Sequence, residues 1–199
     1  MNVWWPLNDH YNRAVGNSQA PDVPRNLVAS FTYQLPFGKG QRWLGATTGP
    51  AQLLFGGWQL SSITLLQSGQ PLRIKTSTDV LGSGVTNSAD VTCSSVKTFG
   101  SVSKWFDTSC FATPKALTLG NAKQGIVRSP GYYNSDLSLS KSVEIREGMR
   151  ISVQADAFNL ANTPHYSSPD TTFGHSNFGV IGGTNGAPRE IQLGTHFTF

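Results

Sequence analysis

The sequence lacks the features that identify several common classes of protein. No run of about 18 apolar residues occurs in the 199-residue chain, which excludes a transmembrane helix. Charged residues make up only 13%, well below the roughly 25% of soluble domains. The net charge of +4 is scattered, and no Lys/Arg cluster alternates with aromatics, so nothing favours a nucleic-acid partner. The two cysteines have no Cys/His cluster around them, which leaves no zinc site.

The C-terminal residues 190–199 contain the clearest pattern that is present. Apolar and polar residues alternate, with Ile191, Leu193 and Phe197 on one face and Gln192 and His196 on the other. Such an apolar-out, polar-in alternation is typical of an outer-membrane β-strand, with aromatics where the strand meets the interface. The alternative is an amphipathic edge strand of a soluble sandwich.

Four further segments alternate in the same way, which predicts an all-β fold. With the terminal strand, the expected strands are 25–35, 53–67, 134–145, 149–160 and 189–199. Ile63 and Leu65 break the alternation of the second segment, and Lys141 is out of place on the apolar face of the third. Residues 1–24 are expected to be an outer loop or the remainder of an upstream strand, and 25–199 to be barrel strands.

The connections between these segments differ greatly in length. Only Arg146-Glu147-Gly148 joins the third strand to the fourth, which predicts a tight hairpin. The second and third strands are separated by about sixty residues and the fourth and fifth by nearly thirty, which is unusual within a compact soluble domain. Outer-membrane barrels have short periplasmic turns and long outer loops. The sequence therefore predicts antiparallel, up-and-down strands of a transmembrane β-barrel in the outer membrane of a Gram-negative bacterium.

The predicted barrel is incomplete. Five strands, or six if a long loop hides another near 71–75, are fewer than the minimum of about eight in bacterial single-chain barrels. An open sheet edge is also not tolerated in lipid. The first six residues, Met1-Asn-Val-Trp-Trp-Pro, have none of the segments of an export signal. We therefore expect the chain to be the tail of a longer exported protein.

Several phrases, taken in their order, resemble the barrel of TonB-dependent receptors, and most closely the Oar-like type with an N-terminal carboxypeptidase-regulatory-like domain. They are Asp22-Val23-Pro24-Arg25, Tyr33-Gln34-Leu35-Pro36-Phe37-Gly38-Lys39-Gly40, Phe55-Gly56-Gly57-Trp58-Gln59-Leu60, Gln67-Ser68-Gly69-Gln70-Pro71, Trp105-Phe106-Asp107-Thr108-Ser109-Cys110-Phe111, Phe158-Asn159-Leu160-Ala161-Asn162 and the terminal Phe.

The resemblance spans about residues 15–199 but only the last quarter of such a receptor. It implies a 22-stranded barrel with an internal plug, which an energised inner-membrane partner pulls to admit bulky ligands. The regulatory-like domain, the plug and the box that recruits TonB are missing here, so TonB would act only through upstream regions. The chain alone is expected to be a fragment unable to transport, and its ligand stays unknown.

The terminal strand also suggests an assembly role. Gln192, Gly194, Phe197 and Phe199 resemble the C-terminal signal that the barrel-assembly machinery of the outer membrane recognises. Outer-membrane lipid and that machinery are therefore the expected partners.

No catalytic, cofactor-binding or metal-binding constellation is found, so an enzyme is not expected. His165 and His175 share a loop with Asp170, but a solvated loop is the stronger interpretation because loop spacing fixes no geometry. Cys93 and Cys110 lie in one exported loop, where an oxidising compartment would let them pair, although two free thiols stay open.

Two other functions fit parts of the sequence. A secreted β-sandwich could bind carbohydrate through Trp4, Trp5, Trp58 and Trp105. A porin or adhesin that never engages TonB would have the same strand pattern.

Overall fold

The computed structural model describes residues 22–46, 48–84 and 87–199. The chain divides into two compact units. One, the barrel sheet unit, consists of 26–66, 133–164 and 186–199; the other, the loop unit, consists of the described residues of 1–25, 67–132 and 165–185. The segment expected as an outer loop or upstream strand, 1–24, lies outside the described residues except for 22–24.

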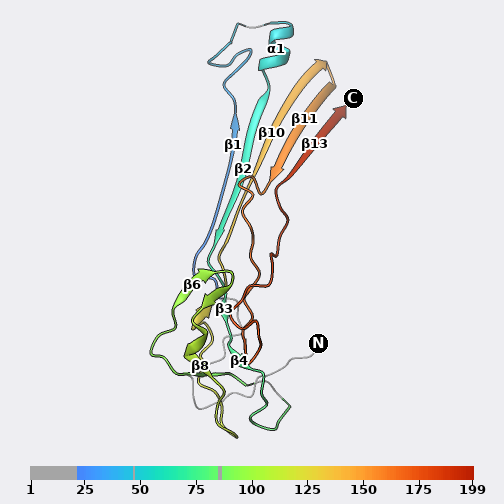
Figure 1. Cartoon of the computed structure of the whole chain (residues 1–199). Coiled ribbons are helices and arrows are strands. Elements are labelled where there is room, and N and C mark those ends of the chain that lie inside the picture. The colour runs from blue at the N-terminus through green and yellow to red at the C-terminus, as the bar shows by residue number, and fades with distance from the viewer. Residues whose placement is uncertain (1–21, 47, 85–86) are drawn as a thin grey trace. The chain divides into compact units, whose positions relative to one another are not determined.

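The barrel sheet unit is built on one five-stranded sheet (Figure 1). Neighbouring strands run in opposite directions, in the order β1-β2-β10-β11-β13, which confirms the predicted all-β, up-and-down fold class. Among the described residues the sheet does not close, and β1 and β13 form its two edges. The strands are β1 (Asn26–Gln34), β2 (Trp58–Gln67), β10 (Tyr132–Arg146), β11 (Met149–Phe158) and β13 (Glu190–Thr198).

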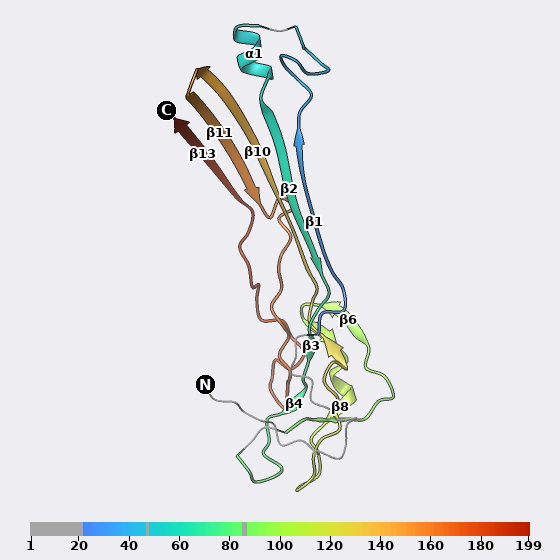
Figure 2. The ribbon, with the colours of Figure 1, turned by 180° about the vertical axis from the view of Figure 1, so that it is seen from behind.

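Both long connections leave this sheet at the same end, as Figure 2 shows from behind. The β2–β10 and β11–β13 connections begin and end there, because the strands alternate in direction. The β10–β11 hairpin, the connection after β1 and the end of β13 lie at the opposite end. The two longest connections thus share one end, the long-loop end, as the outer loops of a barrel do. The other end, the short-turn end, has the tight β10–β11 hairpin and also the longer connection between β1 and β2 that contains α1.

The strand register separates polar from apolar residues. Ser140 lies opposite Gln154, which lies opposite Gly194, and Ser142, Ser152 and His196 form a parallel row on the same face. On the other face, Leu139 lies opposite Ala155 and Ala155 opposite Leu193. Because partners across antiparallel strands share a face, the alternation seen in each strand becomes two continuous surfaces.

The apolar surface of the sheet is not covered by protein. Ile191 is 69% exposed, Leu193 83% and Phe31 54%. Among the described residues, every buried hydrophobic side chain belongs to the loop unit and none to the barrel sheet unit. A row of exposed aliphatic and aromatic side chains is unfavourable in water, whereas hydrocarbon chains of a bilayer would cover it.

The second strand begins later than expected. Residues expected in strand 53–67 form in part a helix, α1 (Pro50–Phe55), and β2 starts only at Trp58. A proline at the helix start favours the first turn, and Gly56-Gly57 ends the helix. Six residues are too short to show a helical period, so α1 is not evident in the sequence. The other four strands begin and end within two residues of the expected bounds.

The loop unit is assembled from short strand pairs contributed by both long connections. Four pairs form: β3 (Pro71–Leu72) with β9 (Val127–Arg128), β4 (Lys75–Thr76) with β12 (Thr172–Phe173), β5 (Asp90–Val91) with β8 (Phe111–Ala112), and β6 (Thr98–Ser101) with β7 (Lys104–Phe106). The strands β3 and β4 occur where an extra strand was considered, but they pair within this unit and do not extend the five-stranded sheet.

An aromatic core holds the two connections of the loop unit together. The ring of Phe106, which is fully buried, lies 5.7 Å from that of Phe111 and 5.2 Å from that of Phe178. Phe178 also contacts Phe173, so residues from both connections share one cluster. Such edge-to-face pairs add roughly 0.5–1.5 kcal/mol each beyond area burial.

Candidate functional site

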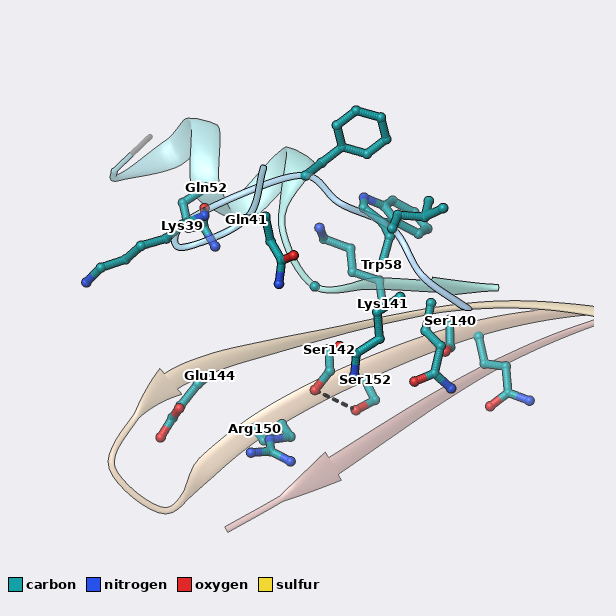
Figure 3. Close-up of a pocket in the computed structure, with 16 residues that line it drawn as sticks. Lys39, Gln41, Gln52, Trp58, Ser140, Lys141, Ser142, Glu144, Arg150 and Ser152 are labelled. Carbon is teal, nitrogen blue, oxygen red and sulfur yellow. Dashed lines mark hydrogen bonds between the residues drawn. The ribbon is translucent and has the colours of Figure 1, made fainter. Parts of the chain in front are cut away.

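A polar groove of about 600 Å³ lies on the barrel sheet at its short-turn end (Figure 3). Its floor is the polar face of β10 and β11, and its upper wall is the connection that contains α1. The polar residues that line it are Gln34, Lys39, Gln41, Gln52, Gln59, Ser140, Lys141, Ser142, Glu144, Arg150, Ser152 and Gln154, and Leu35, Phe37, Gly57 and Trp58 complete the lining.

Hydrogen bonds in this polar face run between neighbours. The Ser152 hydroxyl donates to that of Ser142 over 3.3 Å, and the Gln154 amide donates to both carboxylate oxygens of Asp156 at 2.9 Å. Glu144 and Arg150 are partners in the register, yet they form no ion pair among the described residues. A surface that offers donors, acceptors and both charges suits contact with water or with another polar protein surface.

Lys141, which is out of place in the alternation, reaches backbone carbonyls at the rim of the sheet. It lies opposite Val153 on the apolar face, but its Nζ donates to the carbonyls of Leu54 at 3.1 Å and Gly56 at 2.5 Å. Its ammonium also lies 4.7 Å from the centre of the Trp58 ring. A lysine on a lipid-facing surface is tolerated when its long side chain carries the charge to such an interfacial site.

The Gly56-Gly57-Trp58 phrase of the resemblance has a structural cause. Gly57 has φ +76°, in the left-handed region, and its carbonyl accepts from the Ser142 amide at 3.1 Å. A Cβ at Gly57 would collide with the Ser142 carbonyl. Only glycine allows this close approach of the turn to β10.

Aromatic side chains gather at the same end of the sheet. Phe37 and Trp43 pack edge to face at 5.8 Å, and Phe197 stacks on Phe199 at 5.8 Å. Trp43 is exposed, and Phe199 is 93% exposed. An aromatic belt at this level is what a membrane interface favours.

The residues expected to direct assembly lie on β13, an edge of the sheet. Gln192 donates to Glu190 at 2.7 Å, and nothing lies near the position of a Cβ on Gly194. Phe197 and Phe199 contact each other and are otherwise exposed. Their part in assembly stays a prediction.

At the long-loop end, Asn159 anchors the turn after β11. Its backbone is left-handed (φ 47°) and its side chain is buried. The amide donates to the carbonyls of Thr163 and Ala187 at 3.0 and 3.2 Å, and its oxygen accepts from the Thr163 amide at 2.9 Å. The Asn159 backbone amide donates to Asp136 at 2.9 Å. The Phe158-Asn159-Leu160-Ala161-Asn162 phrase thus marks a turn that joins three segments.

In the loop unit, Cys93 and Cys110 form a disulfide with Cα atoms 5.1 Å apart, as expected for two cysteines of one exported loop.

The two loop histidines lie in different surroundings. His175 Nδ1 lies 2.9 Å from an Asp170 carboxylate oxygen, while His165 is buried and stacks on Tyr132 with ring centres 4.2 Å apart. No group of three potential metal ligands occurs in the described part of the chain.

The Asp170 carboxylate is held in its charged form. Burial raises its pKa, but hydrogen bonds from the Thr172 amide and from His175, with the charge of His175, outweigh burial and lower the pKa overall. Asp170 thus orders the segment that carries β12.

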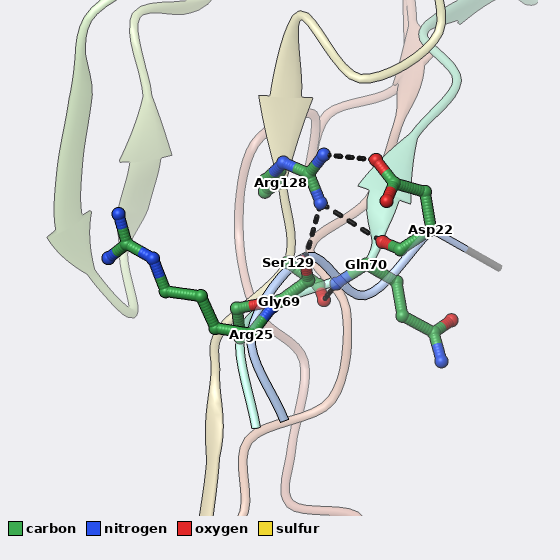
Figure 4. A network of polar contacts seen from close by, with 7 residues as sticks. Asp22, Arg25, Gly69, Gln70, Arg128 and Ser129 are labelled. Atoms are coloured by element: carbon green, nitrogen blue, oxygen red, sulfur yellow. Dashed lines mark hydrogen bonds and ion pairs between the residues drawn. The ribbon is translucent and has the colours of Figure 1, made fainter. Parts of the chain in front are cut away.

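The loop unit contains a polar network around Arg128 that is not evident in the sequence (Figure 4). One guanidinium nitrogen donates to the Asp22 and Gly69 carbonyls at 3.1 and 3.0 Å, and the other donates to the Asp22 carboxylate at 2.6 Å. Beside it the Ser68 amide donates to the Arg25 carbonyl at 2.9 Å, and the Arg25 amide donates to the Ser68 hydroxyl at 3.2 Å. This network explains Asp22 and Gly69 in the phrases of the resemblance, but only the fold brings residue 128 to them.

Comparison with known proteins gave one family. Residues 4–192 match the model of a family described as "Outer membrane beta barrel domain". Neither a curated protein nor a solved structure gave a significant match. In the described part of the chain no helix is long and apolar enough to span a membrane. The match covers nearly the whole chain and agrees with the open antiparallel sheet, its uncovered apolar face and its aromatic rim: the chain belongs to the outer membrane beta barrel domain family and is located in the outer membrane.

Proposed function

We propose that this chain is the C-terminal barrel portion of a TonB-dependent outer-membrane receptor of the Oar-like type, with a binding and transport role and no enzymatic chemistry. The observation that carries the proposal is the open five-stranded sheet, whose edges β1 and β13 have no strand partner among the described residues. Unpaired backbone groups are costly in hydrocarbon, so the sheet needs further strands. A large plugged barrel supplies both those strands and a polar surface inside.

The phrases shared with such receptors also occupy defined places. Gly57 makes the tight approach to β10, Asn159 anchors the turn after β11, and Asp22 pairs with Arg128. In the proposed receptor the groove of Figure 3 lines the lumen, where Glu144 and Arg150 are available to a plug. TonB acts through upstream regions, and the barrel-assembly machinery inserts the chain into lipid.

A porin or adhesin independent of TonB is the second candidate, since the family covers the barrel and not its energisation. The carbohydrate-binding sandwich has less support. No second large sheet packs on the five-stranded sheet in the described residues, and Trp4 and Trp5 lie outside them.

Two measurements test the proposal in steps. The full-length gene product should fractionate with the outer membrane and migrate differently on gels before and after heating, as barrels do. A soluble, monodisperse 199-residue chain would contradict the barrel itself. The sequence upstream of Met1 should encode a plug and a TonB-recruiting box. A heat-modifiable membrane protein with neither would establish the porin or adhesin instead.

A further inference from the structure

The loop unit contains a second groove, of about 460 Å³, that none of the functions above uses. This volume falls in the range of about 300–1,000 Å³ typical of small-molecule sites. Its residues come from both long connections: Pro71, Leu72, Arg73, Lys75, Gln124, Ser168, Pro169 and Thr171.

A strict alternation directs two cations to this groove. In 72–76, Leu72, Ile74 and Thr76 are buried, at 8%, 0% and 1% exposure. Arg73 and Lys75 lie between them, only partly buried, and both line the groove. Successive side chains of an extended segment point to opposite sides, so burial of one set places both cations on the other.

The backbone of this segment is fixed on both sides. The Lys75 amide donates to the Thr171 carbonyl at 3.0 Å, and the Leu72 carbonyl accepts from the Gly125 amide at 2.9 Å. Because β4 pairs with β12, backbone hydrogen bonds between the two strands hold the groove wall in addition to packing. The cations are therefore presented by an ordered support.

The groove has no counter-charge of its own. No carboxylate is among its lining residues, and neither Arg73 nor Lys75 forms an ion pair with a described residue. Burial lowers the pKa of Arg73, which is therefore partly stripped of water without a compensating anion. Gln124, Ser168 and Thr171 add neutral polar groups, and Pro71 and Pro169 add apolar surface.

We propose that this groove binds a small soluble anion, with carboxylate or phosphate oxygens on Arg73 and Lys75 and an apolar part against the prolines. A planar guanidinium binds two oxyanion oxygens at once, and a nearby ammonium adds a point charge. For its biological role the site rests on the proposed receptor function, of which it would define the ligand class. Its chemistry requires neither TonB nor a plug.

Calorimetric titration of the full-length gene product in detergent tests the site, with tricarballylate and inorganic pyrophosphate as probes. Arg73→Gln/Lys75→Gln should weaken binding of at least one probe about tenfold or more, because both charge-assisted contacts are lost. The matched control, Lys97→Gln/Lys104→Gln, removes the same charge from two exposed positions, one just before β6 and one on β7, and should change affinity less than about threefold.

A further variant covers the case in which the double substitution disturbs folding. Gln124→Glu adds a carboxylate to the groove, and Gln124 has no hydrogen bond within the described structure, so binding should be lost without a change in circular dichroism.

Equal losses of probe affinity in the Arg73/Lys75 variant and in the Lys97/Lys104 control would overturn the proposal. Absence of binding of either probe to the wild type at concentrations up to about 10 mM would also overturn it. Binding only to vesicles with anionic lipid would assign the cations to headgroups and also overturn it. The receptor proposal has separate readouts, so failure here leaves membrane fractionation and the upstream sequence unaffected.

Discussion

Replacement of Asn159 should destabilise the barrel sheet unit more than replacement of any single surface polar residue. Asn159→Ala removes three side-chain hydrogen bonds to Thr163 and Ala187 from a buried site. At about 1 kcal/mol each, these contribute about 3 kcal/mol. Alanine also adopts the left-handed conformation at a cost of about 1 kcal/mol. The expected loss of unfolding free energy is about 4 kcal/mol.

A second variant separates the two contributions. Asn159→Gly loses the same hydrogen bonds but tolerates φ 47°, so it should be more stable than Asn159→Ala by about 1 kcal/mol. The assay is urea unfolding of the full-length gene product in detergent, followed by tryptophan fluorescence. Asn134→Ala is the control, because it loses one side-chain hydrogen bond, to the Asp136 carboxylate, and should cost about 1 kcal/mol. An Asn159→Ala variant within about 1 kcal/mol of wild type would refute the role of this anchor.

Four further outcomes are expected. Phe199→Ala should reduce membrane insertion in cells but leave refolding in detergent unchanged, because a 93% exposed ring contributes little burial energy. Cys93→Ser/Cys110→Ser should lower unfolding free energy by about 3 kcal/mol, from loss of a cross-link over 17 residues. Gly57→Ala should lower it by at least about 1–2 kcal/mol, for strain at φ +76° and for collision with β10. Wild type should have a higher free energy of unfolding than Asp170→Asn at neutral pH. This difference should shrink below about pH 5 and vanish well below the ordinary carboxyl pKa of about 3.9, because a lowered pKa stabilises the fold only while the group is charged.

Each of these expectations has a specific contradiction. Normal insertion of the Phe199 variant with impaired refolding would assign Phe199 to packing. Mass spectrometry that finds two free thiols in exported protein would remove the disulfide. Gly82→Ala, at φ +65° with open space around it, controls for Gly57→Ala; equal losses would mean that contact with β10 is irrelevant. A stability difference between wild type and Asp170→Asn that grows on acidification would mean that the pKa of Asp170 is raised in the fold and not lowered.

The sequence alone was sufficient to predict the five strands of the sheet and their lipid environment, except that β2 starts later than expected and α1 precedes it. Alternation with a period of two depends only on the extended backbone, so residues 134–145 and 149–160 could be placed and divided into two faces without any knowledge of their neighbours. A three-residue connection between them left a hairpin as the only pairing. An apolar face on every strand, together with few charges, then indicated a lipid environment.

Tertiary structure alone decided what the long connections do. Phe106 and Phe178 lie 72 positions apart in sequence, and no local period brings their rings together. The same holds for Asp22 and Arg128, and for the groove that joins Arg73 to Ser168. Lys141 contradicts its strand's alternation until Leu54 and Gly56 are in place. Strand alternation is a local property and is readable from sequence, whereas these contacts depend on how distant segments fold back on one another.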